Sequence, residues 1–223
     1  MDGTPFLDVP FVVVDVETTG TSPLHGDRVT EVAAMIVERH PARPVLTVRE
    51  GFHALVNPGR PIPWHITRLT GISDAMVRGA PGFADIAGDL AAQLVGRVFV
   101  AHNAAFDWGF LSAEFARVSA VPLDALATGQ LCTVRLARRL LAHLPRRNLD
   151  AVSAHYGVTI EGRHRAAGDA YATAQVLLGL LRDAERDGIH TLEAVQGVLA
   201  RRTAAARRGR SGLPRATNGA DGV

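Results

Sequence analysis

Short β-branched runs bounded by turn residues predict the strands of this chain. The clearest run is Phe-Val-Val-Val-Asp-Val-Glu at residues 11–17, which ends at the turn Thr-Thr-Gly. Further strands are expected at 29–38, 48–56 and 97–101. The segment 131–141 is compatible with either a strand or a helix, and its pattern does not decide between them.

Apolar positions with helical spacing predict the other elements. The expected helices cover 63–69, 82–94, 103–118 with Asn103 as N-cap, 148–156 ending at Gly157, 169–187 ending at Gly188, and about 191–202. Three strands followed by alternating strands and helices indicate an α/β domain with a mixed sheet.

The charged residues divide the chain unevenly. All 24 basic residues are arginine; residues 201–223 hold six of them and one acid, whereas residues 1–200 hold 18 arginines and 21 acids. From residue 204 onward arginine, glycine and alanine dominate without apolar periodicity, which predicts a disordered tail. We therefore expect a lead at 1–8, a domain at 9–203 and a tail at 204–223. The tail either attracts phosphates by counterion release or is merely solvated.

Several classes of protein do not fit this composition. A single cysteine provides neither a disulfide framework nor a cysteine-based zinc site. The first ten residues carry acids and lack the basic start of a signal peptide, and the apolar runs are too short to cross a bilayer. A Rossmann-type cofactor site is not expected because no Gly-x-Gly-x-x-Gly follows the first strand. We expect a cytoplasmic protein.

Two carboxylates interrupt the otherwise apolar first strand. Asp15 and Glu17 are two residues apart, so their side chains leave the same face, while Val14 and Val16 point to the other. Neighbouring acids on a buried strand repel each other and are costly unless they are paired or bind a metal. A turn cap beside a solvated acid is the alternative, but the apolar surroundings favour a metal site.

Two later segments add a histidine and two more acids. Asp107 is expected in the first turn of a helix, where the helix dipole alone would explain a carboxylate. His164 precedes Asp169 by five residues, a spacing that turns about 500° on a helix. We therefore expect His164 on a loop and Asp169 at the start of the helix. By itself, a lone histidine such as His164 is more often an ordinary surface or core residue than a functional one.

Taken together, these acids suit phosphodiester hydrolysis. The reaction needs an attacking hydroxide, a stabilised leaving oxygen and neutralisation of the charge between them, which two divalent ions roughly 3.5–4 Å apart supply. Mg²⁺ prefers carboxylate oxygens and keeps several waters, so four acids suffice. A neutral histidine can accept the proton of the attacking water.

Three segments resemble the motifs of the DEDDh exonucleases, the group that includes the proofreading epsilon subunit of DNA polymerase III and ribonuclease T. They are Val-Val-Asp-Val-Glu-Thr-Thr-Gly at 13–20, His-Asn-Ala-Ala-Phe-Asp at 102–107 and His-Arg-Ala-Ala-Gly-Asp at 164–169. Weaker similarity occurs at 69–72 and 148–152, and the whole resemblance covers about residues 9–185. It implies a ribonuclease H-like fold, a five-stranded mixed sheet flanked by helices, with the site on the central strand.

The resemblance also implies roles for individual residues and two Mg²⁺ or Mn²⁺ ions per site. Asp15, Glu17 and Asp169 would hold the catalytic ion, and Asp107 would hold a second ion that Asp15 bridges. His164 would be the general base. Contacts to the terminal nucleotide would come from Thr18, His65, Thr70 and Phe106.

The implied activity is a 3′→5′ exonuclease that acts on single-stranded or frayed DNA ends in proofreading or repair and releases nucleoside monophosphates. An RNA-trimming exoribonuclease of the ribonuclease T kind would use the same five residues. A non-catalytic nucleic-acid-binding module would require the loss of a carboxylate, and none is missing. A DNA polymerase partner is a further implication, although the tail is unlike the polymerase-docking extension of the epsilon subunit.

Overall fold

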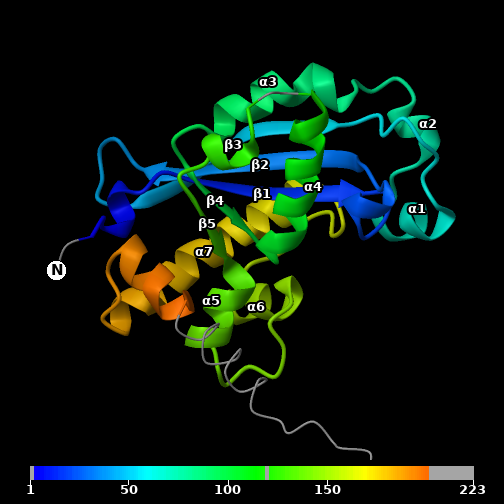
Figure 1. Cartoon of the computed structure of the whole chain (residues 1–223). Coiled ribbons are helices and arrows are strands. Elements are labelled where there is room, and N and C mark those ends of the chain that lie inside the picture. Colours follow the sequence, from blue (N-terminus) through cyan, green and yellow to red (C-terminus); the bar gives the residue numbers. More distant parts are fainter. Residues whose placement is uncertain (1–2, 119–120, 201–223) are drawn as a thin grey trace, which may run out of the picture.

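The computed structural model describes residues 3–118 and 121–200. A five-stranded sheet forms its centre, in the order β3-β2-β1-β4-β5 (Figure 1). The strands are β1 Phe11–Thr18, β2 Val29–Arg39, β3 Leu46–Leu55, β4 Val98–Ala101 and β5 Gly129–Cys132. The pairs β1–β2 and β2–β3 are antiparallel, whereas β1–β4 and β4–β5 are parallel. The predicted mixed sheet is thus confirmed, with β1 in the middle.

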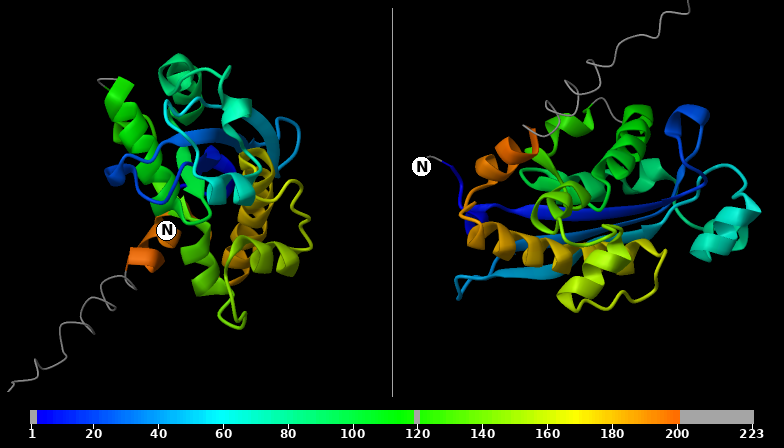
Figure 2. Two further views of the ribbon diagram at one scale, coloured as in Figure 1. Left: turned by 90° about the vertical axis from the view of Figure 1, so that its right-hand side faces the viewer. Right: turned by 90° about the horizontal axis from the view of Figure 1, so that it is seen from below.

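Helices cover both faces of this sheet (Figure 2). The α-helices are α1 Trp64–Thr70, α2 Asp74–Val77, α3 Phe83–Leu94, α4 Ala104–Val118, α5 Thr133–Leu140, α6 Leu149–Tyr156 and α7 Ala166–Arg186; short 3-10 turns are η1 Phe6–Asp8, η2 Pro23–His25 and η3 Leu123–Ala125, and residues 192–200 are also helical. The core on one face joins the sheet to α5, α6 and α7, and the core on the other joins it to α3 and α4. None of the helices in the described residues is long and apolar enough to span a membrane.

The structure corrects the sequence prediction in three places. The undecided segment 131–141 contains both element types, because β5 ends at Cys132 and α5 begins at the next residue. Helix α7 begins at Ala166, three residues before the predicted start, so Asp169 lies inside the first turn. Asn103 precedes α4 as expected, but its φ of 84° is left-handed rather than the extended conformation of most N-caps. The predicted tail at 204–223 lies outside the described residues.

Strand β1 presents different chemistry on its two faces. Val12, Val14 and Val16 are buried in the core beneath α3 and α4. On the opposite face, Val13 packs into the α7 core, and Asp15 and Glu17 follow it at the half-buried end of the strand. The same alternation that buries the valines therefore brings both acids to the side where α7 begins.

A glycine allows the first turn of α7 to approach the preceding loop closely. A Cβ atom at Gly168 would lie 1.7 Å from the carbonyl oxygen of Glu161, closer than any non-bonded contact allows. The loop from Glu161 to Arg165 carries His164, and this contact sets its distance from the helix. Gly168 is consequently required by backbone packing beside the candidate site.

We expect Gly168→Ala to lower the free energy of unfolding by about 1–3 kcal/mol, since the added methyl group overpacks this contact. Gly109→Ala in α4 is the matched control, because a Cβ there meets no atom within 4 Å. Alanine is the better helix former, so the control is expected to be neutral or to stabilise by up to about 1 kcal/mol. Urea denaturation of both variants measures the difference, and equal stabilities would contradict this view of the loop.

Candidate active site

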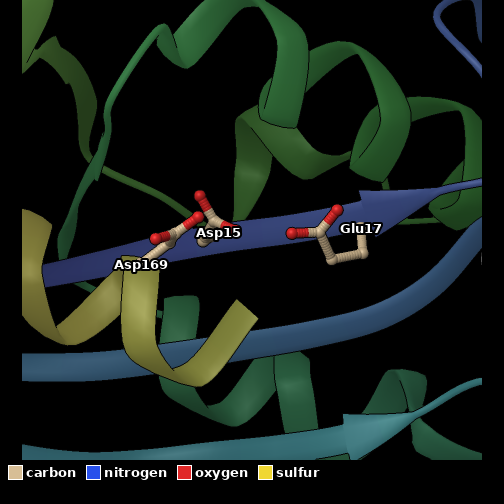
Figure 3. A group of neighbouring side chains, drawn as sticks. All are labelled: Asp15, Glu17 and Asp169. Atoms are coloured by element: carbon tan, nitrogen blue, oxygen red, sulfur yellow. The ribbon is translucent and has the colours of Figure 1, made fainter. Parts of the chain in front are cut away.

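Three of the predicted carboxylates form one cluster. Oxygen atoms of Asp15, Glu17 and Asp169 all lie within 4.8 Å of one another. Asp15 and Glu17 project from β1, and Asp169 reaches them from the first turn of α7 (Figure 3). Residues separated by more than 150 positions in the sequence thus present acidic oxygens to a common point.

Asp107 lies beside this cluster but is not one of its three members. It occupies the first turn of α4, where it is only 3% exposed. Its Oδ1 accepts a hydrogen bond from the backbone N–H of Val16 at 3.2 Å, which ties α4 to β1. Its charge acts on Asp15 strongly enough to raise the pKa of that carboxyl. Asp107 of α4 therefore lies close enough to Asp15 for their charges to interact.

Burial and mutual repulsion raise the pKa values of these carboxyls above their ordinary range. Burial, followed by the charges of Asp107, Glu17 and Asp169, raises the pKa of Asp15 well above its ordinary value. Burial and then Asp169 raise the pKa of Glu17 to about 8. Burial raises the pKa of Asp107 to about 7 despite its backbone hydrogen bonds. The cluster is thus poorly compensated by the protein alone.

Arg163 supplies the positive charge that the cluster does receive. Its Nη1 pairs with Oδ2 of Asp169, and its Nε pairs with Asp150 at 2.9 Å. The other oxygen of Asp169, Oδ1, is buried and has no hydrogen-bond partner among the described residues. One guanidinium therefore leaves acidic oxygens unsatisfied, and this donor set of half-buried and buried carboxylates fits a hard divalent cation.

His164 lies on the loop before α7, as predicted. Its φ is 63°, a left-handed conformation that is uncommon outside glycine and occurs often at functional sites. Its backbone N–H donates to Oδ2 of Asp169 at 3.2 Å, and its Nδ1 lies 3.4 Å from Nη1 of Arg163. The imidazole is therefore positioned at the edge of the carboxylate cluster and remains half-buried.

A buried ion pair that the sequence analysis missed fixes the residue after His164. Glu31 of β2 is fully buried and accepts hydrogen bonds from Nη2 of Arg165 at 2.6 Å, the N–H of Ala166 at 2.9 Å and Nε2 of His53 at 2.9 Å. Burial opposes ionisation of Glu31, but these bonds more than offset it and lower its pKa. The available signal was an acid followed by a long apolar run in the same strand, as acids within an apolar strand had pointed to Asp15 and Glu17.

The four residues predicted to contact the nucleotide lie at the end of β1, on α1 and on α4. Thr18 ends β1 and its hydroxyl donates to the carbonyl of Gly20 at 2.6 Å. Thr70 and the exposed His65 belong to α1, which lies beyond the C-terminal end of β1 (Figures 1 and 2). The half-buried ring of Phe106 in α4 packs against Phe110 with centroids 4.8 Å apart. Thr18 and Thr70 are both buried, and the hydroxyl of Thr70 donates to the carbonyl of Ile66 at 3.0 Å.

Comparisons of sequence place this arrangement among nucleases. The sequence model of the family described as Exonuclease matches residues 12–177. A DNA polymerase III subunit epsilon-like protein of Rhodobacter capsulatus is 38% identical over 86% of this chain and 26% of its own length. A PolC-type DNA polymerase III of Bacillus subtilis is 34% identical over 80% of this chain and 12% of its own. The chain thus spans about a quarter or less of these relatives.

Solved structures share the fold at low sequence identity. Exonuclease X, solved with 5′ overhanging duplex DNA, has a TM-score of 0.59 and 23% identity and covers 83% of this chain and 99% of its own. Exonuclease I of E. coli, solved with a dT13 oligonucleotide, has a TM-score of 0.67 and 18% identity over 80% of this chain and 42% of its own. These likenesses confirm the ribonuclease H-like architecture.

The raised carboxyl pKa values predict how stability without metal depends on pH. Between pH 4.5, the ordinary value for Glu17, and its folded value of about 8, the folded protein holds a proton that the unfolded chain has released. The contribution of Glu17 to the free energy of unfolding is therefore fully present below pH 4.5 and is lost as the pH rises through about 8. In EDTA, we expect the melting temperature to fall from pH 5 to pH 9.

Glu17→Gln is the matched variant for this measurement, because an amide keeps the shape of the side chain and does not titrate. Its melting temperature in EDTA should fall less steeply than that of the wild type over the same range. Divalent cations should raise the wild-type melting temperature most at the alkaline end, where the carboxylates are ionised. Parallel pH profiles for the two proteins would show that Glu17 does not titrate as described.

Proposed function

The chain belongs to the exonuclease family, and we propose that within it the protein is a metal-dependent 3′→5′ exonuclease that releases nucleoside monophosphates from DNA ends. The observation that carries the proposal is the meeting of Asp15, Glu17 and Asp169 within 4.8 Å, with a buried oxygen of Asp169 that lacks a partner among the described residues. Without a cation the fold holds such a cluster by keeping carboxyls protonated, whereas a bound cation would let them ionise.

Mg²⁺ or Mn²⁺ ions are the cofactors that suit these ligands. Asp15, Glu17 and Asp169 would hold one ion, and Asp107 of α4, whose charge acts on Asp15, would contribute to a second. Bound ions would supply the Lewis acid that polarises the scissile phosphate and lowers the pKa of the attacking water. Arg163 would then release Asp169, while Asp150 still offers it an ion pair.

His164 is the residue that we assign to proton transfer. It lies at the edge of the cluster with its backbone fixed by Asp169 and, one residue later, by the Glu31–Arg165 pair. In its neutral form it can accept the proton of an attacking water and pass it to solvent, to which its half-buried ring has access. Glu31 acts as a positioning residue, because it touches the loop rather than the reacting atoms.

The terminal nucleotide would bind between the C-terminal end of β1 and the neighbouring helices. Thr18 at the end of β1, His65 and Thr70 of α1, and Phe106 of α4 would contact it there. Both structural neighbours described above were solved with DNA, which supports DNA as the substrate. The epsilon-like and PolC-type relatives likewise support a role beside a DNA polymerase.

An RNA-trimming activity is the second candidate. A 3′-exonuclease solved for its recognition of the 3′ end of a histone mRNA stem-loop shares this fold, with a TM-score of 0.63 and 16% identity. Digestion of matched single-stranded DNA, mispaired duplex DNA and RNA with Mg²⁺ or Mn²⁺ separates the two candidates. Faster release of monophosphates from DNA supports the main proposal, and faster release from RNA supports the second.

We expect Asp15→Ala to abolish release of monophosphates from every substrate, because this carboxylate interacts with all three other acids. Removal of one acid also relieves repulsion in the metal-free protein, so the variant should melt no lower than the wild type in EDTA. Product release measured by chromatography, together with melting curves, tests both statements. Activity above a few per cent of wild type in Mg²⁺ would overturn the site assignment.

His164→Ala should slow turnover by about 10²–10⁴-fold, the usual contribution of a general base. Metal affinity should change little, since the histidine side chain is not assigned as a ligand. Single-turnover rates at saturating Mn²⁺, with calorimetric Mn²⁺ titrations of both proteins, test this pair of outcomes. If turnover stays within a few-fold of wild type, the base is another group.

A further inference from the structure

A cavity of about 610 Å³ opens beside the carboxylates, and arginines line much of its wall. Asp15 and Asp169 border it at one end. The lining also includes Arg138 of α5, Arg146 and Arg147 of the loop that leads to α6, and Arg163 of the loop before α7. No acid other than Asp15 and Asp169 lines the cavity among the described residues. The carboxylate cluster is therefore continuous with a cleft that is lined by arginines, which we call the basic cleft.

The four arginines differ in what they already bind. Arg163 is neutralised by Asp169 and Asp150. Arg147 is committed to the backbone, because its Nη2 donates to the carbonyls of Leu141 at 3.0 Å and Ala142 at 2.6 Å. Arg146 is exposed and forms no salt bridge within the described part of the chain. Arg138 is exposed near the C-terminal end of α5 and also takes part in an interaction within the protein.

His102 holds this wall in place beside the carboxylates. A carbonyl can only accept, so Nε2 of His102 must donate to the carbonyl of Arg147, which lies at 3.1 Å. Its Nδ1 then accepts from the hydroxyl of Thr133, the first residue of α5, at 2.9 Å. Burial lowers the pKa of His102 to about 4, so the ring keeps this neutral form at physiological pH. The cleft is thus preformed.

We propose that this cleft binds the phosphate backbone of a single nucleic-acid strand on the 5′ side of the scissile phosphate, with Arg138 and Arg146 contacting successive phosphates. The inference rests on the proposed exonuclease function, since it assigns the path of the strand that the carboxylates cut. Arginine contacts to phosphates attract a strand without reading its sequence. A cavity of this size holds a ligand of about one or two nucleotides.

The distribution of charge supports this assignment. Residues 1–200 hold more acids than arginines, so the domain as a whole does not attract a polyanion. Around the cleft the balance is reversed, with four arginines and two acids, and both acids belong to the proposed metal site. A strand that reaches the carboxylates through the cleft would avoid the repulsion that it meets over most of the surface.

Binding of a fluorescein-labelled 12-nucleotide DNA strand, measured by anisotropy in Ca²⁺ over a range of salt concentrations, tests the cleft. Arg138→Ala and Arg146→Ala should each weaken binding, and each should reduce the slope of log affinity against log salt by about 0.7. Arg139→Ala is the matched control, because Arg139 is the exposed neighbour on α5 that does not line the cavity. It should leave affinity, salt slope and hydrolysis unchanged.

A second readout distinguishes the strand from the free product. In the double variant Arg138→Ala/Arg146→Ala, the loss of kcat/KM should be large on the 12-nucleotide strand and small on a nitrophenyl ester of a single nucleotide. Inhibition of this variant by nucleoside monophosphate should persist. An unaltered salt slope in the double variant, or an equal loss in Arg139→Ala, would overturn the cleft assignment. A wild type that binds the strand but hydrolyses neither substrate would instead refute the proposed function.

Discussion

Repulsion among four carboxylates at one end of β1 is the constraint on which the rest of this structure depends. Asp15, Glu17, Asp107 and Asp169 come from three elements, and burial makes their ionised forms costly. Nothing in the packing of a five-stranded sheet requires acids at these positions. Their presence is explained when cations are bound there, because the energy that the acids cost the metal-free fold is then recovered as metal affinity.

The surrounding chain limits this cost by using arginines on either side of His164. Arg163 pairs with Asp169, and Arg165 pairs with the buried Glu31. Together these two ion pairs bind the loop to α7 and to β2, so His164 is fixed from both directions. Asp169 also lies in the first turn of α7, where the helix dipole favours a carboxylate. The same contacts that offset repulsion therefore orient the candidate base.

The sequence was most informative where function interrupts a regular pattern. The alternation of β1 correctly placed Asp15 and Glu17 on the face opposite Val14 and Val16, because strand periodicity is strict. The start of α7 was placed too late, since Arg165 at the N-cap position makes no side-chain capping bond and the following alanines carry no boundary signal.

Long-range contacts were beyond the reach of local patterns. The partner of Glu31 lies 134 residues further along the chain, and the arginines of the cleft meet the carboxylates only through the fold. The boundary between β5 and α5 could not be read because a four-residue strand passes directly into a helix. The roles of Thr18, His65, Thr70 and Phe106 are predictions from resemblance, because contacts to a substrate leave no periodic signal in the sequence.

The most direct test of this account is a crystal structure of the protein grown with Mn²⁺, with the anomalous signal used to locate the ion. We predict an Mn²⁺ peak among Asp15, Glu17 and Asp169, with the guanidinium of Arg163 displaced from Asp169 and still near Asp150. At saturating Mn²⁺, an intact pair between Arg163 and Asp169 with no ion among the three carboxylates would contradict it.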